Sequence, residues 1–126
     1  MQGYSERLND IRGIMKFRVV ENVYTEFNTE KTFKKMLRKV SVRRPVPGLY
    51  VITEPLFEAG MMEIYNYNEL LQPFYRKQKR TVNVLGMAKS RDGAKKVVSE
   101  ILEDVYEKYN SPDINSFFQI GGEEIT

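Results

Sequence analysis

The stretch RDGAKKVVSEILEDVYEKYN, residues 91–110, carries the strongest secondary-structure signal in the chain. Its apolar residues recur at alternating steps of three and one, which places them along one side of an α-helix. They are Ala94, Val97, Val98, Ile101, Leu102, Val105, Tyr106 and Tyr109. Ser90 and Asp92 can accept hydrogen bonds from the first amides of this helix, and Pro112 lies just beyond its end. A helix with one apolar side requires apolar surface elsewhere in the chain to pack against.

Three strand-like segments precede this helix and can supply that surface. They are GLYVIT (48–53), MMEIYNY (61–67) and RTVNVLGMAK (80–89). Short links between neighbouring strands favour an antiparallel meander. Pro55, in the first link, indicates an edge position or the end of a strand. In the third strand Gly86 predicts a bulge, with Val82 and Val84 on one face and Leu85 and Met87 on the other.

The N-terminal third carries two further periodic segments. In NTEKTFKKMLRKV (28–40) the residues Phe33, Met36, Leu37 and Val40 predict a helix, with Asn28 or Thr29 as its cap. The segment VRRPVPG (42–48) ends it. Upstream, apolar residues recur every three or four positions and predict an earlier helix: Leu8, Ile11, Met15, Val19, Val23 and Phe27. The β-branched and aromatic residues of KFRVVENVYTEF (16–27) leave a strand open as the alternative.

These segments predict an α+β fold with N-terminal helices, a three-stranded antiparallel meander, and a long C-terminal amphipathic helix packed on one sheet face. We expect one domain over residues 1–126, because its 126 residues are an ordinary domain length. Its parts would be a helical N-terminal part (1–45), the sheet with its helix (46–110) and a tail (111–126). The tail contains an apolar patch of Ile114, Phe117 and Phe118.

The composition removes several kinds of chemistry. The chain contains no cysteine and no histidine, so thiolate and imidazole groups are not available as nucleophiles, bases or metal ligands. We therefore expect a protein that is not an enzyme and holds no cofactor or metal. No apolar run is long enough for a signal peptide or a membrane span, which predicts a cytoplasmic protein without membrane contact. Four acids, at positions 100, 103, 104 and 107, lie opposite the apolar side of the last helix, so we expect them to face water.

Charge is unevenly distributed along the chain. Residues 31–96 carry 15 Lys and Arg against 5 Asp and Glu, a balance of +10, and the rest carries 5 against 12, a balance of −7. The two regions could neutralise each other within one chain or between chains. We expect the protein to associate with itself, for example as a dimer, or to bind another protein. In self-association the basic middle of one chain would contact the acidic last helix of the next. The interface candidates are Tyr65, Tyr67, Glu100, Glu103, Asp104 and Glu107.

Nucleic-acid binding is the alternative prediction. The candidate residues for a basic patch are Arg76, Lys77, Lys79, Arg80, Lys89, Arg91, Lys95 and Lys96. Lysine and arginine side chains bind the phosphate backbone of RNA or DNA, and nearby aromatic rings can stack on bases. The segment YRKQKR (75–80) contributes to such a surface only if it shares a face with the lysines that begin the last helix.

The order of a helix, three strands and a helix over residues 29–109 resembles the double-stranded-RNA-binding domain. The start of the last helix, KSRDGAKKVVSEIL (89–102), is similar to that family's final helix, whose clustered lysines meet phosphates across a groove. The resemblance implies an RNA-facing role for Lys89, Lys95 and Lys96. The chain departs from the family in the turn EPLFEAG (54–60), which carries two acids and lacks the family's histidine.

Overall fold

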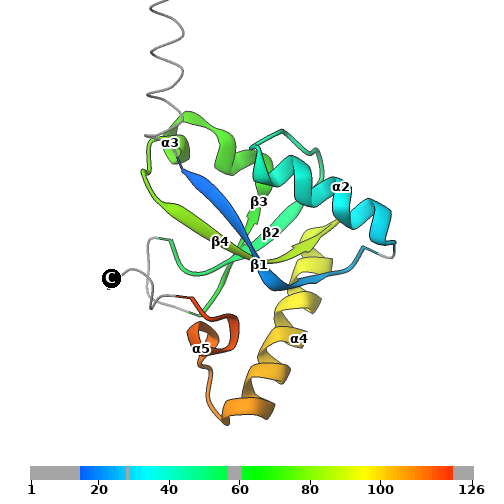
Figure 1. Cartoon of the computed structure of the whole chain (residues 1–126), viewed down its shortest axis with the longest axis vertical. Helices are drawn as coiled ribbons and strands as arrows, with labels where there is room; N and C mark the ends of the chain where they lie inside the picture. Colours follow the sequence, from blue (N-terminus) through cyan, green and yellow to red (C-terminus); the bar gives the residue numbers. More distant parts are fainter. Residues whose placement is uncertain (1–14, 28, 57–60, 121–126) are drawn as a thin grey trace, which may run out of the picture.

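The computed structural model describes residues 15–27, 29–56 and 61–120, and these form an α+β fold around one mixed four-stranded sheet (Figure 1). The order of elements is β1 (Lys16–Thr25), α2 (Glu30–Ser41), β2 (Tyr50–Thr53), β3 (Glu63–Asn66), the 3₁₀ helix η1 (Tyr67–Leu71), α3 (Pro73–Arg76), β4 (Thr81–Ala88), α4 (Arg91–Tyr109) and α5 (Ile114–Phe118). Across the sheet the strands lie in the order β1-β4-β2-β3.

The first described element is a strand, so the helix expected from Leu8 to Phe27 is wrong over residues 16–25, where the alternative of a strand holds. Strand β1 runs parallel to β4, with Phe17 opposite Val82 and Val19 opposite Val84. Its side chains reach both faces of the sheet, since Phe17 belongs to one buried cluster and Val20 to the other. In this segment the preference of β-branched and aromatic residues for strands therefore outweighs the helical spacing of the apolar residues. Leu8 and Ile11 of the expected helix lie outside the described residues.

The three expected strands are present, but they do not form a meander. Strand β2 pairs antiparallel with β3 on one side and with β4 on the other. Residues 67–80, which include η1 and α3, carry the chain from the β3 edge to a position between β2 and β1. Because β4 has a partner on each side and helices over both faces, every residue from Val82 to Ala88 is buried. Pro55 follows the end of β2, as expected, although β2 is a central strand.

Helix α2 lies over one face of the sheet, and α4 and α5 lie over the other (Figure 1). The α2-side cluster includes Val40, Val51, Val82, Val84, Met87 and Tyr67. The α4-side cluster includes Ile52, Leu85, Ala94, Val97, Ile101, Val105, Ile114 and Phe118. Residues 111–120 are thus part of the core, with Ile114, Phe118 and Ile120 all buried, whereas the sequence predicts a tail.

Both long helices begin and end as their sequences predict. The Ser90 hydroxyl accepts a hydrogen bond from the Gly93 amide at 3.0 Å, and Asn110 ends α4 with a φ of 56°. The Thr29 hydroxyl caps α2 by accepting from the Thr32 amide at 3.2 Å. These side chains satisfy amides that have no partner within the helix, so the helix ends are fixed locally.

The expected bulge in β4 is present, and it reverses the predicted face of Met87. Thr53 pairs with Val84 and Ile52 with Gly86, so Leu85 is the extra residue. After the bulge, Met87 joins Val82 and Val84 on the α2 side while Leu85 remains on the α4 side. A β-carbon at position 86 would lie 2.8 Å from Val97 Cγ1 and 3.0 Å from Ile52 Cδ1. Only glycine lets α4 approach the strand this closely.

Gly86→Ala should therefore destabilise the protein, because the added methyl group forces α4 away from β4. We expect a loss of about 1–3 kcal/mol of unfolding free energy, measured by urea denaturation. The double variant with Val97→Ala should lose less than the sum of the two single changes, since removing the Val97 methyl groups makes room. Additive losses would contradict this explanation of Gly86.

Candidate interaction surfaces

The outer side of α2 forms a basic face, made of Lys31, Lys34, Lys35 and Arg38. Their spacing of i, i+3, i+4 and i+7 stacks the four side chains along one side of the helix, and all four are exposed. The same helix turns Phe33, Met36 and Val40 toward the sheet. One neighbouring acid moderates this face, because Glu30 Oε1 lies 3.3 Å from Lys34 Nζ.

The outer side of α4 forms an acidic face with the same spacing, made of Glu100, Glu103, Asp104 and Glu107. All four are exposed, as predicted, because the opposite side of α4 is buried against the sheet. Asp104 accepts a hydrogen bond from the Tyr24 hydroxyl of β1. Burial raises the pKa of Tyr24, and the bond to Asp104 raises it further. Among the described residues, Glu100, Glu103 and Glu107 make no hydrogen bond to β1.

The two charged faces lie on opposite sides of the sheet. Helix α2 packs on the first core cluster and α4 on the second, so the sheet separates them (Figure 1). Among the described residues, the ion pair of Glu30 with Lys34 stays within α2, and none joins α2 to α4. Within residues 15–27, 29–56 and 61–120, α2 and α4 therefore do not neutralise each other, and the charged side chains of both faces are exposed.

The two tyrosines proposed for the interface occupy different environments. Tyr65, on β3, is half-buried, and its hydroxyl donates to Glu63 Oε1 at 2.9 Å. Burial and then this bond raise the pKa of Tyr65. Tyr67 begins η1, one residue after β3 ends, and is fully buried in the α2-side cluster. Of the two, only Tyr65 has surface that a partner could touch.

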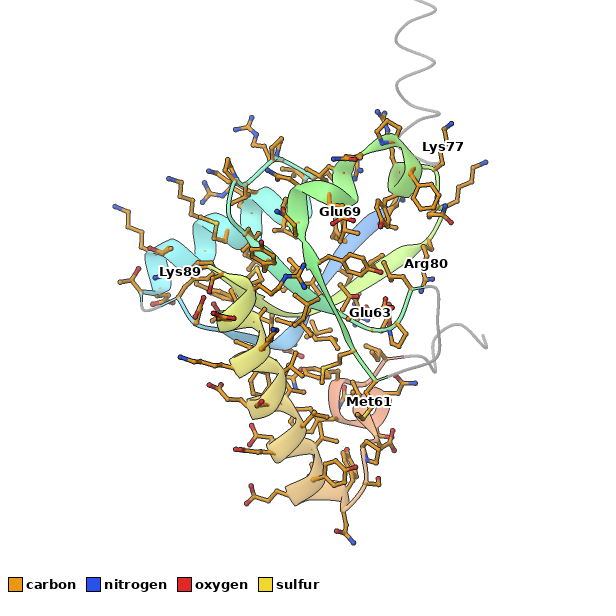
Figure 2. The ribbon with its side chains drawn as sticks, turned by 180° about the vertical axis from the view of Figure 1, so that it is seen from behind. Met61, Glu63, Glu69, Lys77, Arg80 and Lys89 are labelled. Carbon is orange, nitrogen blue, oxygen red and sulfur yellow. The ribbon has the colours of Figure 1, made fainter. Side chains whose placement is uncertain are left out.

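The residues of the predicted nucleic-acid patch fall into two groups at opposite ends of β4. Arg76, Lys77, Lys79 and Arg80 precede this strand, and Lys89, Arg91, Lys95 and Lys96 follow it. Eight residues at ~3.3 Å each separate the ends by about 26 Å. Figure 2 shows Lys77 and Arg80 on one side and Lys89 on the other. Arg80 is also engaged, since its Nη1 donates to the Leu56 carbonyl at 2.9 Å.

A carboxylate that no local sequence pattern predicts occupies the start of α4. Glu26, which directly follows β1, accepts a hydrogen bond from the Lys89 amide. It lies so close to Gly93 that a β-carbon there would overlap with the Glu26 carboxylate. An anion at this position is favourable because helix amides point toward it. The carboxylate also adds negative charge among Lys89, Arg91 and the lysines beyond, which weakens that group as a phosphate site.

A second feature that sequence reasoning missed is Arg43, just after α2. Its Nε and Nη2 atoms are buried, and so is the hydroxyl oxygen of Tyr67. None of the three has a hydrogen-bond partner among the described residues. The Arg43 guanidinium carbon lies 5.9 Å from the centroid of the Phe17 ring. Nothing local in the segment VRRPVPG distinguishes a buried arginine from an exposed one.

Between α2 and the segment that leads into β2 there is an apolar hollow of about 190 Å³. It is lined by Phe27, Met36, Val46, Pro47, Gly48, Leu49 and Lys89. Over residues 15–27, 29–56 and 61–120, no group of three or more acids is placed to hold a metal ion. Within the same residues, no helix has both the length and the apolar character of a membrane span.

No protein-family model matches the chain, and searches of the curated proteins and of the solved structures gave no match. The double-stranded-RNA-binding architecture is not supported by the topology, because the sheet has four strands, one of them parallel, and β4 lies between β1 and β2. The two charged faces and Arg43 are therefore the features from which a function can be argued.

Proposed function

We propose that this protein is a non-catalytic assembly module whose copies associate through the basic face of α2 on one molecule and the acidic face of α4 on the next. The observation that carries this proposal is the match between the two faces. Each has four charged side chains at i, i+3, i+4 and i+7 on an exposed helix side, with opposite sign. Complementary charge of this kind guides association and fixes which surfaces meet.

The arrangement of the faces favours a head-to-tail contact. A two-fold dimer that paired α2 with α4 twice would need both helices on one side of each molecule, and the sheet separates them. A contact between different surfaces leaves one free face at each end, so it extends into a ring or a chain of molecules. We therefore expect oligomers that grow with concentration and dissociate as salt screens the charges.

Charge reversal with complementation tests the proposal. Variant A carries Lys35→Glu and Arg38→Glu on α2, and variant B carries Glu103→Lys and Glu107→Lys on α4. Each alone should associate about tenfold or more weakly than the natural protein in sedimentation at low salt. An equimolar mixture should associate again, because the unchanged α4 of A fits the unchanged α2 of B and the reversed α2 of A fits the reversed α4 of B. Both variants spare Lys34 and Asp104, which have partners within the molecule.

Lys77→Glu with Lys79→Glu serves as the matched control, since it changes the net charge as much as variant A does at exposed positions outside both faces. This control should associate like the natural protein. If the mixture of A and B stayed monomeric while each variant was folded, the helix contact would be excluded. A monomeric natural protein at low salt and micromolar concentration would exclude the assembly function itself.

Nucleic-acid binding is the second candidate, and the basic face of α2 is the observation that favours it. Phosphate binding requires only cations, so it should be lost in variant A and retained in variant B, whereas assembly requires both faces. Loss in the Lys77 and Lys79 control instead would place the contact on the group before β4. A gel-shift assay with duplex RNA, duplex DNA and single strands at about 50 mM salt would distinguish these outcomes.

A further inference from the structure

The backbone at Arg43 is that of a helix end where glycine is favoured. The Arg43 amide donates to the Val40 carbonyl at 3.1 Å, and the Arg44 amide donates to the Lys39 carbonyl at 2.8 Å. These two bonds form a Schellman motif, in which the residue after the cap takes a left-handed conformation. Arg43 has a φ of 57°, which is unfavourable for a residue with a β-carbon. The end of α2 therefore gives no reason for an arginine at this position.

The side chain of Arg43 places two N–H donors of a charged group beneath the surface. Its Nε and Nη2 atoms are buried without an acceptor among the described residues, although the side chain as a whole is partly exposed. Burial lowers the pKa of Arg43, and the charge of Arg76 lowers it further. Arginine nevertheless keeps its proton in proteins, so the charge and the two unpaired donors remain.

A third unpaired donor lies near Arg43, on the neighbouring element η1. Tyr67 is fully buried, its hydroxyl has no partner among the described residues, and its ring centroid lies 5.4 Å from that of Phe17. Burial raises the pKa of Tyr67 to about 12, against the opposing effect of the Arg43 charge. This phenol therefore stays protonated and can donate a hydrogen bond. Phe17 contacts both groups, since the Arg43 guanidinium lies over its ring.

The donors define the chemistry of a group that would satisfy them. Nε and Nη2 are adjacent on one edge of the guanidinium, and that edge binds the two oxygens of a carboxylate side by side. The negative charge of a carboxylate would balance the positive charge of Arg43. Its oxygens also have further lone pairs that can accept a hydrogen bond from the Tyr67 hydroxyl. It is also flat and small, which suits a buried position better than a tetrahedral phosphate.

We propose that Arg43 and Tyr67 form a binding site for a carboxylate group, with Phe17 as its apolar floor and Arg76 adding positive charge nearby. Because the Arg43 side chain is partly exposed, a carboxylate approaches the donors from that side. The same chemistry can come from a free small acid or from an acidic side chain of a second copy. This site is separate from the charged faces of α2 and α4 and stands whether or not those faces associate.

Thermal unfolding in sodium acetate and in sodium chloride at equal ionic strength tests the site. At about 50 mM acetate the natural protein should unfold several degrees higher than in chloride, because a ligand that binds the folded state stabilises it. Arg43→Met should show no difference between the two salts. In chloride it should unfold higher than the natural protein, since it no longer buries an unpaired charge. Tyr67→Phe should show a smaller acetate effect.

Arg44→Met is the matched control, because Arg44 is adjacent and exposed. It should keep the full acetate effect. Equal midpoints in acetate and chloride for the natural protein, or an acetate effect that survives Arg43→Met, would overturn the proposal. A larger effect of phosphate than of acetate would overturn the choice of a carboxylate.

Sedimentation of the natural protein with and without acetate distinguishes the two sources of the carboxylate. Acetate that displaces the acidic side chain of a second copy should weaken association, and Arg43→Met should then associate more weakly than the natural protein in chloride. A free acid as the ligand should leave the oligomeric state unchanged in both proteins. The ¹⁵N chemical shift of Arg43 Nε should move on acetate addition in either case, and an unchanged shift would contradict direct binding.

Discussion

Replacing Phe118 with alanine should remove about 3–5 kcal/mol of unfolding free energy, which is a large part of the stability of an ordinary domain. Phe118 is only 4% exposed and belongs to the α4-side cluster. Its ring lies 6.1 Å from Tyr24 of β1, at an interplanar angle of 74°. The loss should be large because the neighbouring side chains are fixed by the sheet and by α4 and cannot close the cavity.

Phe117→Ala is the matched control for Phe118. Phe117 is the adjacent residue in α5 but is half-buried, with its ring 5.9 Å from Lys108 Nζ. Its replacement should cost about 1 kcal/mol, since less apolar area is lost. Urea denaturation of the two variants measures both values. Equal losses would mean that α5 is not held in the core by Phe118 in the way the structure shows.

The position of α5 depends on contacts that no local sequence pattern predicts. The helices α2 and α4 were predicted because their apolar spacing and caps are local signals that extend over three or more turns. The five residues of α5 are too few for a periodic pattern. Ile114 and Phe118 could be recognised as apolar, but their burial depends on contacts with β1 and α4, which no local pattern reveals.

The sheet order was missed for a related reason. The segments of β2, β3 and β4 have the composition of strands, and composition identifies a strand without giving its neighbours. The parallel pairing of β1 with β4 joins Phe17 to Val82, residues that are far apart in the sequence. Proximity along the chain favours a meander, and this long-range pairing overrides it.

The candidate sites divide in the same way. The exposed acids of α4 followed from helical periodicity, because the side opposite an apolar stripe faces water. Tyr67 was expected beside Tyr65 on one strand, but η1 begins at Tyr67 and turns it into the core. The unpaired donors of Arg43 depend on three separate segments, those of Phe17, Arg43 and Tyr67, and only the folded structure brings these together.

Glu54 explains how β2 can end inside the sheet, because its carboxylate replaces the next residue of the strand. Beyond Thr53, the last residue of β2 that pairs with β4, the Asn83 amide has no β2 carbonyl to bind. Glu54 Oε1 accepts from this amide at 3.0 Å, and Glu54 Oε2 accepts from Asn83 Nδ2 at 2.9 Å. Asn83 is only 8% exposed, so water cannot easily take over these bonds.

Glu54→Ala should therefore cost about 3–4 kcal/mol of unfolding free energy, because it leaves two buried donors of Asn83 unpaired. Glu54→Gln keeps an acceptor for the backbone amide but turns an NH₂ group toward Asn83 Nδ2, and it should lose about half as much. Glu21→Ala, at an exposed position on β1, should change stability by less than about 0.5 kcal/mol. Urea denaturation measures all three. A loss at Glu54→Ala no larger than at Glu21→Ala would show that Asn83 does not need this carboxylate, and the end of β2 would require another explanation.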